Sequence, residues 1–262
     1  MITHNFKKKF GQNFLQDKNI IKKIVDICNP DKEDLIIEIG PGAGALTEEL
    51  VKKSKVLAYE IDIDLKNHLL EKFSNNDIIF IFDDFLNRKI SEDLTDYSYK
   101  NIYVIANLPY YITTPIINKI IEENINVKKM VLMVQKEVGD RFSAKVGTRE
   151  YSSITVFLNY FFDVKKEFVV SRNVFYPKPN VDSIILSFTK KEKSNKVLNE
   201  ELFFKIVKDS FKQKRKTLKN NLKDYDFFKV EEVLLKNNLP IDVRAENINI
   251  DTYIEISNKL NS

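Results

Sequence analysis

The chain has 262 residues, 43% hydrophobic and 31% charged, so its composition excludes a disordered protein and allows one large domain with a smaller one. A single cysteine, Cys28, excludes an internal disulfide framework, and the two distant histidines predict no metal site. No apolar run approaches the roughly 18 residues that a membrane span needs, and no apolar segment follows the basic N-terminus. We therefore expect a cytoplasmic protein without a membrane segment or secretory signal.

The formal net charge is only +4, but the basic residues are unevenly distributed. Eight of them lie between Lys205 and Lys223, against the single acid Asp209. A second basic cluster stands near the N-terminus, and the candidate polyanion-binding residues are Lys7, Lys8, Lys9, Lys212, Lys214, Arg215, Lys216 and Lys219. The charge pattern alone leaves open whether these residues bind a nucleic acid or form a solvated helix face.

In chain order, short apolar runs alternate with helical patterns through the first part of the sequence. We expect strands at 35–39, 56–59, 78–82, 102–105 and 130–134, and helices at 45–53, 65–73 and 115–123. Strands that are continuously apolar and separated by helices are typical of a parallel sheet covered on both faces. The sequence therefore predicts an α/β fold.

The pattern changes after residue 150. Residues 154–170 and 183–189 are predicted to be strands with little helix between them, which suggests that an antiparallel pair closes the sheet. A polar linker follows at 190–196, and the remaining pattern predicts helices at 200–214, 227–237 and 250–260. We expect two domains, residues 1–190 with the sheet and residues 191–262 as a small helical domain.

A glycine-rich loop follows the first predicted strand. Gly40, Gly42 and Gly44 are spaced as Gly-x-Gly-x-Gly, which lets a ligand approach bare backbone beside the N–H groups of a helix N-terminus. Glu60 ends the next strand, where an acid commonly binds ribose hydroxyls. The loop indicates a nucleoside-like cofactor, and by itself it also fits a NAD-dependent oxidoreductase.

Asp83 and Asp84 follow the third predicted strand, at the sheet edge where ligands of such folds bind. One of these carboxylates could accept a hydrogen bond from an adenine amino group. The sequence leaves open which of the two does so.

The segment Asn107-Leu108-Pro109-Tyr110 ends the fourth predicted strand. An exocyclic adenine amine is a poor nucleophile because its lone pair is delocalised into the ring. The side-chain oxygen of Asn107 and the backbone carbonyl of Leu108 could each accept one N–H of such an amine. Pro109 stiffens the turn, and Tyr110 offers a ring on which a base can stack. Alone, the segment would fit an ordinary strand-ending turn with a half-buried tyrosine. After the glycine loop and the acid at Glu60, it favours a site that alkylates an adenine amine.

At these residues the sequence resembles the KsgA-type rRNA adenine dimethyltransferases, a branch of the class I S-adenosylmethionine-dependent methyltransferases. The resemblance runs nearly end to end, through five motifs in order. They are Phe10-Gly11-Gln12-Asn13-Phe14-Leu15, Glu38-Ile39-Gly40-Pro41-Gly42-Ala43-Gly44, Asn107-Leu108-Pro109-Tyr110-Tyr111-Ile112-Thr113-Thr114-Pro115, Phe175-Tyr176-Pro177-Lys178-Pro179-Asn180-Val181-Asp182-Ser183 and Phe211-Lys212-Gln213-Lys214-Arg215-Lys216-Thr217-Leu218.

The resemblance implies a role for each matching residue. Asn13 and Leu15 would close over the cofactor, S-adenosylmethionine. The loop with Gly40 and Gly42 would face its methionine part. The other implied contacts are Glu60 with the ribose, Asp84 with the adenine, Asn107 with both cofactor and target amine, and Tyr110 and Phe175 on either side of the target base. Two positions depart from the family pattern: Lys214-Arg215 replaces adjacent arginines, and Asp83 replaces a glycine.

The resemblance also implies the reaction and its partner. We expect a Rossmann-like methyltransferase sheet at 1–190 and a basic, RNA-binding helical domain at 191–262. The enzyme would dimethylate the N6 amines of two adjacent adenosines in a hairpin loop near the 3′ end of 16S rRNA, during small-subunit biogenesis, as a monomer and without a metal. Two alternatives remain, a large-subunit rRNA adenine methyltransferase of the macrolide-resistance type and a non-catalytic RNA-binding assembly factor.

Overall fold

The structure is a computed structural model that describes residues 14–108, 112–192 and 197–262. The chain forms two compact units: Met1–Gly139 with Lys165–Thr189, and Asp140–Val164 with Lys190–Ser262. The sequence predicts one boundary near residue 190, so the grouping of residues 140–164 with the helical unit is a difference from that expectation. Within the described ranges, no helix is both long enough and apolar enough to cross a membrane.

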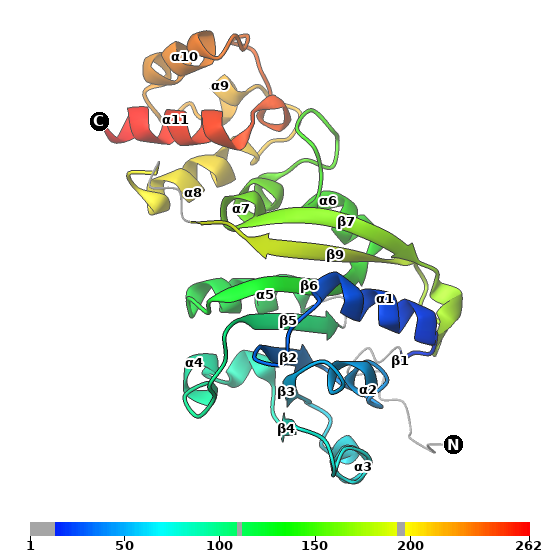
Figure 1. Cartoon of the computed structure of the whole chain (residues 1–262). Coiled ribbons are helices and arrows are strands. Elements are labelled where there is room, and N and C mark those ends of the chain that lie inside the picture. The colour runs from blue at the N-terminus through cyan, green and yellow to red at the C-terminus, as the bar shows by residue number, and fades with distance from the viewer. Residues whose placement is uncertain (1–13, 109–111, 193–196) are drawn as a thin grey trace. The chain divides into compact units, whose positions relative to one another are not determined.

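A seven-stranded sheet organises the first unit (Figure 1). Its strand order is β4-β3-β2-β5-β6-β9-β7; the first five strands run parallel, and β9 is antiparallel to β6. This confirms the predicted α/β sheet with an antiparallel closure. The strands are β2 (Leu35–Ile39), β3 (Lys55–Tyr59), β4 (Ile78–Ile81), β5 (Ile102–Asn107), β6 (Val127–Gln135), β7 (Phe162–Val170) and β9 (Ser183–Lys190).

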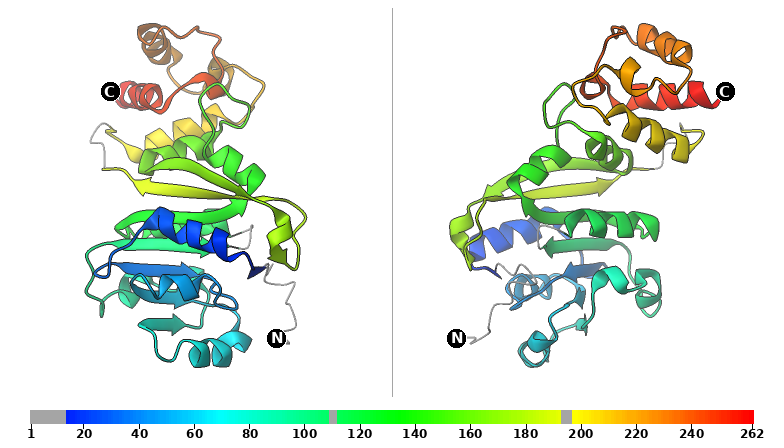
Figure 2. Two further views of the ribbon diagram at one scale, coloured as in Figure 1. Left: turned by 45° about the vertical axis from the view of Figure 1, so that its right-hand side comes forward. Right: turned by 180° about the vertical axis from the view of Figure 1, so that it is seen from behind.

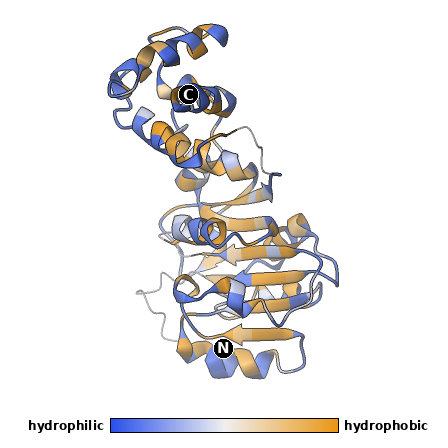
Figure 3. Ribbon diagram, turned by 90° about the vertical axis from the view of Figure 1, so that its left-hand side faces the viewer, coloured by the Kyte–Doolittle hydropathy of each residue, from blue (hydrophilic) through white to orange (hydrophobic). Residues whose placement is uncertain are grey.

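The central strands are apolar on both faces because helices cover both faces of the sheet. All five residues of β2 are buried, and α1 (Lys18–Cys28) lies on the opposite face from α5 (Thr113–Glu122) (Figure 2). Figure 3 shows the strands as mostly hydrophobic and the connecting segments as mostly hydrophilic. The shorter helices of this unit are α2 (Thr47–Leu50), α3 (Lys66–Lys72) and α4 (Ile90–Asp93), and α6 (Lys136–Phe142) spans the boundary between the units.

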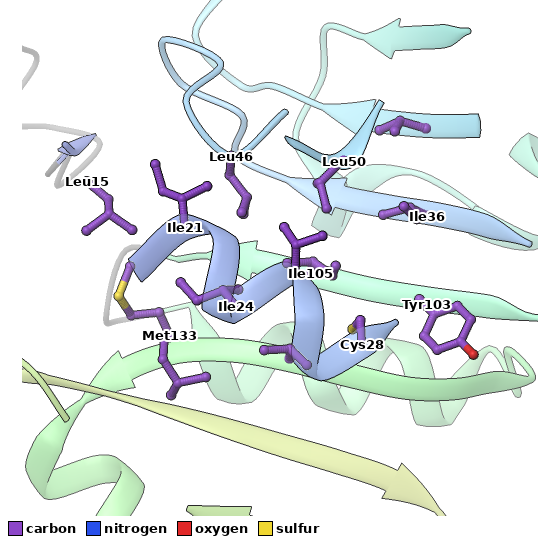
Figure 4. Close-up of a cluster of buried hydrophobic side chains, with 14 of the residues drawn as sticks. Leu15, Ile21, Ile24, Cys28, Ile36, Leu46, Leu50, Tyr103, Ile105 and Met133 are labelled. Carbon is purple, nitrogen blue, oxygen red and sulfur yellow. The ribbon is translucent and has the colours of Figure 1, made fainter. Parts of the chain in front are cut away.

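The main core of the first unit surrounds α1. Ile21, Ile24 and Cys28 share one face of this helix, as a helical repeat of three to four residues requires, and they pack on side chains of β5 and β6 (Figure 4). Burial raises the pKa of the Cys28 thiol to about 12, so this cysteine is an apolar core residue at neutral pH.

The second unit is helical apart from the start of β7, and one prediction for it is wrong. Residues Ser153–Phe161 form the helix α7, although the sequence predicts a strand from 154. A capping box formed by Ser152 and Thr155 starts this helix, and its aromatic side chains pack on α8 (Glu200–Ser210). The other helices are α9 (Leu218–Asn221), α10 (Phe227–Lys236) and α11 (Ile250–Asn261).

Helix α8 ends at Ser210, four residues before the predicted end. The side chain of Asn221 donates to the backbone oxygens of Ser210 (2.7 Å) and Gln213 (3.2 Å) and accepts from the Gln213 N–H (3.1 Å). These bonds hold residues 211–217 as a turn. Lys212, Lys214, Arg215 and Lys216 therefore lie on a connecting turn between α8 and α9, and Lys219 lies in α9.

Candidate cofactor- and adenine-binding site

One cavity of about 260 Å³ opens at the carboxyl ends of the parallel strands in the first unit. Its lining includes most of the residues that the sequence selects: Leu15, Gly40, Gly42, Glu60, Asp83, Asp84, Asn107, Leu108 and Phe175. The two halves of the predicted site, around Gly40 and around Asn107, therefore share one space. Asn13 and Tyr110 lie outside the described residues.

The glycine loop follows β2 directly. Gly42 has φ +57°, and a Cβ on this residue would lie 2.6 Å from a ring carbon of Phe14, so a larger side chain would collide with that ring. The amides of the loop are already bonded: Gly40 N–H donates to the Tyr59 carbonyl, Gly42 N–H to Glu60 and Gly44 N–H to the Pro41 carbonyl. The predicted helix at 45–53 is only the single turn α2. The loop thus offers close access to backbone, and the expected free N–H groups at a helix start are not found at these three glycines.

Glu60 connects the glycine loop with the end of β3. Its two carboxylate oxygens accept from the backbone N–H groups of Gly42 and Asp62, each at 2.8 Å, and only 3% of the residue is exposed. Burial raises the pKa of Glu60, although these backbone hydrogen bonds oppose the rise. Glu60 thereby fixes the shape of the loop and presents its carboxylate to the cavity.

A second buried carboxyl, Glu38, lies in β2 just before the loop, and sequence reasoning gave it no role. The Thr47 hydroxyl donates to its Oε2 at 2.7 Å, which ties β2 to α2 across the loop. Burial raises the pKa of Glu38 to about 8, because the charged form is poorly solvated there. The available signal in the sequence is one acid inside an otherwise apolar strand.

The raised pKa of Glu38 makes folding stability depend on pH. Above about pH 4.5 the unfolded state ionises while the folded state keeps its proton, so the free energy of unfolding should fall toward pH 8. Glu38→Gln keeps the shape without titrating. We expect the difference in unfolding free energy between wild type and variant to change by about 1.4 kcal/mol per pH unit in this interval. Urea denaturation of both proteins at pH 5, 6, 7 and 8 measures this difference. A difference that stays the same at every pH would show that Glu38 is ionised in the folded protein.

Asp83 and Asp84 both line the cavity, but their carboxylates have different partners. Asp83 accepts from the Asp84 N–H at 2.7 Å, and its other oxygen lies 3.7 Å from the Arg88 guanidinium. Asp84 Oδ1 accepts from the Leu86 N–H at 2.9 Å and caps the short 3-10 helix Phe85–Asn87. Its Oδ2 has no hydrogen bond within the described ranges. Asp84 Oδ2 is therefore more available to accept a hydrogen bond from a ligand than either carboxylate oxygen of Asp83.

Asn107 is the last residue of β5, and Leu108 follows it into the cavity wall. Phe175 stands well beyond Asn107 in the chain and reaches the cavity in the two-residue strand β8 (Phe175–Tyr176). This strand pairs antiparallel with β1 (Phe14–Leu15), which places Leu15 opposite Phe175. Sequence reasoning missed Phe14, which lies in the quoted motif and also lines the cavity.

The basic candidates of the second unit are all exposed: Lys212, Lys214, Arg215, Lys216 and Lys219. Lys214 and Arg215 line a groove of about 490 Å³ with Arg149 and Arg244, which the sequence did not select because they stand in no basic cluster. Lys212 forms a 2.8 Å ion pair with Asp209. Lys7, Lys8 and Lys9 lie outside the described residues.

The family model described as ribosomal RNA adenine dimethylase matches residues 3–262. One curated relative is the ribosomal RNA small subunit methyltransferase A of Mycoplasma mobile, 45% identical, covering 99% of this chain and 100% of the relative. The protein of the same name from Streptococcus gordonii is 44% identical over 98% of this chain and 92% of its own.

Two solved structures are similar over nearly their full length. A dimethyladenosine transferase from Plasmodium falciparum aligns with TM-score 0.76 and 25% identity, covering 93% of this chain and 95% of the other. The 23S rRNA methyltransferase ErmE aligns with TM-score 0.78 over 95% of this chain and 100% of its own; at 24% identity it shows the shared fold alone. Because the two solved structures share this fold under different names, the family is assigned from the sequence matches. The chain belongs to the ribosomal RNA adenine dimethylase family.

Proposed function

We propose that this protein dimethylates the N6 amines of two adjacent adenosines in a hairpin loop near the 3′ end of small-subunit rRNA. Family membership makes it an rRNA adenine dimethyltransferase that depends on S-adenosylmethionine, and the relatives named for the small subunit support the choice of rRNA. The single cavity that joins the glycine loop to Asn107 and Phe175 is the observation that carries the proposal.

The cavity fits the cofactor in its chemistry. Its walls are largely apolar, and its carboxylates stand at the ends of β3 and β4, where hydroxyl and amino donors need acceptors. Glu60 would bind the ribose hydroxyls, Asp84 the adenine amine, and the loop at Gly40 and Gly42 the methionine part, with Leu15 and Asn13 as cover. When bound, the cofactor supplies an electrophilic methyl group on a sulfonium.

The residues around Asn107 would align the target amine. The Asn107 side-chain oxygen and the Leu108 carbonyl would each accept one N–H of the amine. This favours the geometry in which the nitrogen lone pair is no longer delocalised into the ring. The amine becomes positive as it reacts, so these dipoles stabilise the developing charge and a strong base is not required. Phe175, with Tyr110, would stack on a base that has been turned out of its RNA helix.

The second unit would hold the RNA by its phosphates. Lys212, Lys214, Arg215, Lys216 and Lys219 supply exposed positive charge that neutralises a backbone without reading its sequence, and Lys7, Lys8 and Lys9 would add to it. Arg149 and Arg244 extend this surface along the groove. We further propose that the protein acts as a cytoplasmic monomer on the RNA of a partly assembled small subunit, and that the sheet unit is catalytic and the helical unit binds RNA.

Asp84→Asn should weaken cofactor binding more than Asp83→Asn. Asparagine at 84 keeps the Oδ1 cap of Leu86 but turns the second acceptor into a donor, which opposes the adenine amine. Because a hydrogen bond to a charged group contributes about 1.5–3 kcal/mol, we expect Kd to rise by at least about tenfold for Asp84→Asn and by less than about threefold for Asp83→Asn. Calorimetry with S-adenosylhomocysteine measures both, and equal effects would contradict the assignment.

Labelled methyl transfer to separated ribosomal particles tests the proposed function. S-adenosylmethionine with a radioactive methyl group is supplied with unmodified small or large subunits, and the labelled nucleotide is mapped. We expect label on two adjacent adenosines of the small-subunit RNA and none on the large subunit. Label on the large subunit would favour the macrolide-resistance type of enzyme. Binding to the small subunit without label would favour an assembly factor.

A further inference from the structure

The two-stranded sheet of β1 and β8 touches both halves of the cavity. Phe14 and Leu15 pair with Tyr176 and Phe175, and the Gln16 N–H donates to the Val174 carbonyl at 3.0 Å just beyond the pair. A two-stranded pair of this length is only marginally stable through its backbone hydrogen bonds. Its side-chain contacts therefore decide whether it forms.

These contacts reach in opposite directions. The Phe14 ring lies against Gly42 in the glycine loop, where a Cβ would come within 2.6 Å of it. Leu15 and Phe175 are buried together in the core cluster around α1, and both line the cavity. Phe14 therefore contacts the half of the cavity that would hold the cofactor, while its partner strand carries the ring that would stack on the target base.

The segment 172–182, which contains β8, is closed on itself and tied to the rest of the first unit. The Asp182 carboxylate accepts from the Arg172 N–H at 3.0 Å, and its backbone carbonyl accepts from the Lys136 N–H at 3.0 Å. These bonds lie outside β8, so the position of Phe175 also depends on how firmly its partner strand β1 is held. Through the ring of Phe14, β1 contacts the glycine loop, which would hold the cofactor.

We propose that Phe14 is a positioning residue through which occupancy of the cofactor half of the cavity orders β1, β8 and Phe175, so that cofactor and target RNA bind cooperatively. This inference rests on the proposed function for the identity of the two ligands. Coupling of this kind is reciprocal: the factor by which the cofactor tightens RNA binding equals the factor by which RNA tightens cofactor binding.

Hydrogen–deuterium exchange tests the first step without any RNA. In the wild type, saturating S-adenosylhomocysteine should slow exchange of the Gln16 amide and of residues 174–176. In Phe14→Ala the same ligand should bind but leave this exchange unchanged, and Phe14→Leu should restore part of the protection. Equal protection in wild type and Phe14→Ala would overturn the proposal, because the ligand would then act on β8 directly.

The second step is measured by the affinity of the full-length protein for unmodified small subunits with and without S-adenosylhomocysteine. We expect about tenfold tighter binding with the ligand for the wild type, and a ratio near one for Phe14→Ala. Phe228→Ala, at a phenylalanine 81% exposed in the second unit, is the matched control and should keep the wild-type ratio. A wild-type ratio of one alongside normal methyl transfer overturns the coupling alone, whereas failure to bind S-adenosylhomocysteine or to transfer methyl groups overturns the proposed function.

Discussion

Asn107→Ala should lower the rate of methyl transfer by about 100- to 1000-fold, the range found when one preorganised polar group is removed from a charge-stabilising site. The side chain stands at the end of β5 in the wall of the cavity, and its loss leaves the target amine one acceptor short. Cofactor affinity should change by less than about tenfold, because the ribose and adenine contacts remain. Single-turnover transfer with saturating cofactor and small subunits measures the chemical step.

Asn75→Ala is the matched control for this experiment. Asn75 is an exposed asparagine in the turn after α3, and its replacement should leave both rate and affinity unchanged. A thermal unfolding curve for Asn107→Ala shows whether the fold is retained. If a folded Asn107→Ala protein transferred methyl groups within about threefold of the wild-type rate, the proposed alignment of the amine would be wrong.

Glu60→Ala should weaken S-adenosylhomocysteine binding by about 100-fold or more. The variant removes the proposed acceptor for two ribose hydroxyls, and it also leaves the Gly42 and Asp62 N–H groups without their carboxylate. Glu60→Gln should be affected nearly as strongly. Its amide has one acceptor oxygen, whereas the Gly42 and Asp62 N–H groups each bond to a separate carboxylate oxygen of Glu60. Calorimetry well below the unfolding temperature gives the affinities, with the exposed Glu71→Ala on α3 as control.

A ribose-modified ligand separates the two roles of Glu60. The analogue of S-adenosylhomocysteine that lacks the 2′ and 3′ hydroxyls should bind the wild type more weakly than S-adenosylhomocysteine does. Glu60→Ala should bind the analogue and S-adenosylhomocysteine with about equal affinity. If the losses from the variant and from the analogue added up instead, Glu60 would act only by shaping the glycine loop.

The sheet could be predicted because the local sequence of each strand identifies it. Residues 35–39 and 102–105 are continuous apolar runs, and such runs become strands buried on both faces wherever helices alternate with them. Residues 154–161 misled the prediction because isoleucine, valine, threonine and aromatic residues favour strands. Their helical state depends on a cap at Ser152 and on packing against Phe203 and Phe204 of α8, about 45 residues further along the chain.

The site could be predicted where a motif carries it and not where the fold alone assembles it. Gly40, Glu60 and Asn107 stand at the carboxyl ends of the neighbouring parallel strands β2, β3 and β5, so their meeting at one edge follows from topology. The approach of Phe14 to Gly42 depends on how the N-terminal segment pairs with β8, which local sequence does not specify. Arg149 and Arg244 stand alone in the sequence and meet Lys214 and Arg215 only in the folded second unit.

The hydrogen bonds of Asn221 have a kinetic consequence for the turn at residues 211–217. Because they fix its shape in advance, the lysines and arginine on it would lose little chain entropy on docking to the proposed RNA partner. Long-range attraction depends on the charges and weakens with added salt, whereas the lifetime of the complex depends on how well those charges fit. If this turn binds RNA as proposed, a protein without the Asn221 amide would encounter the RNA as often as before and release it sooner.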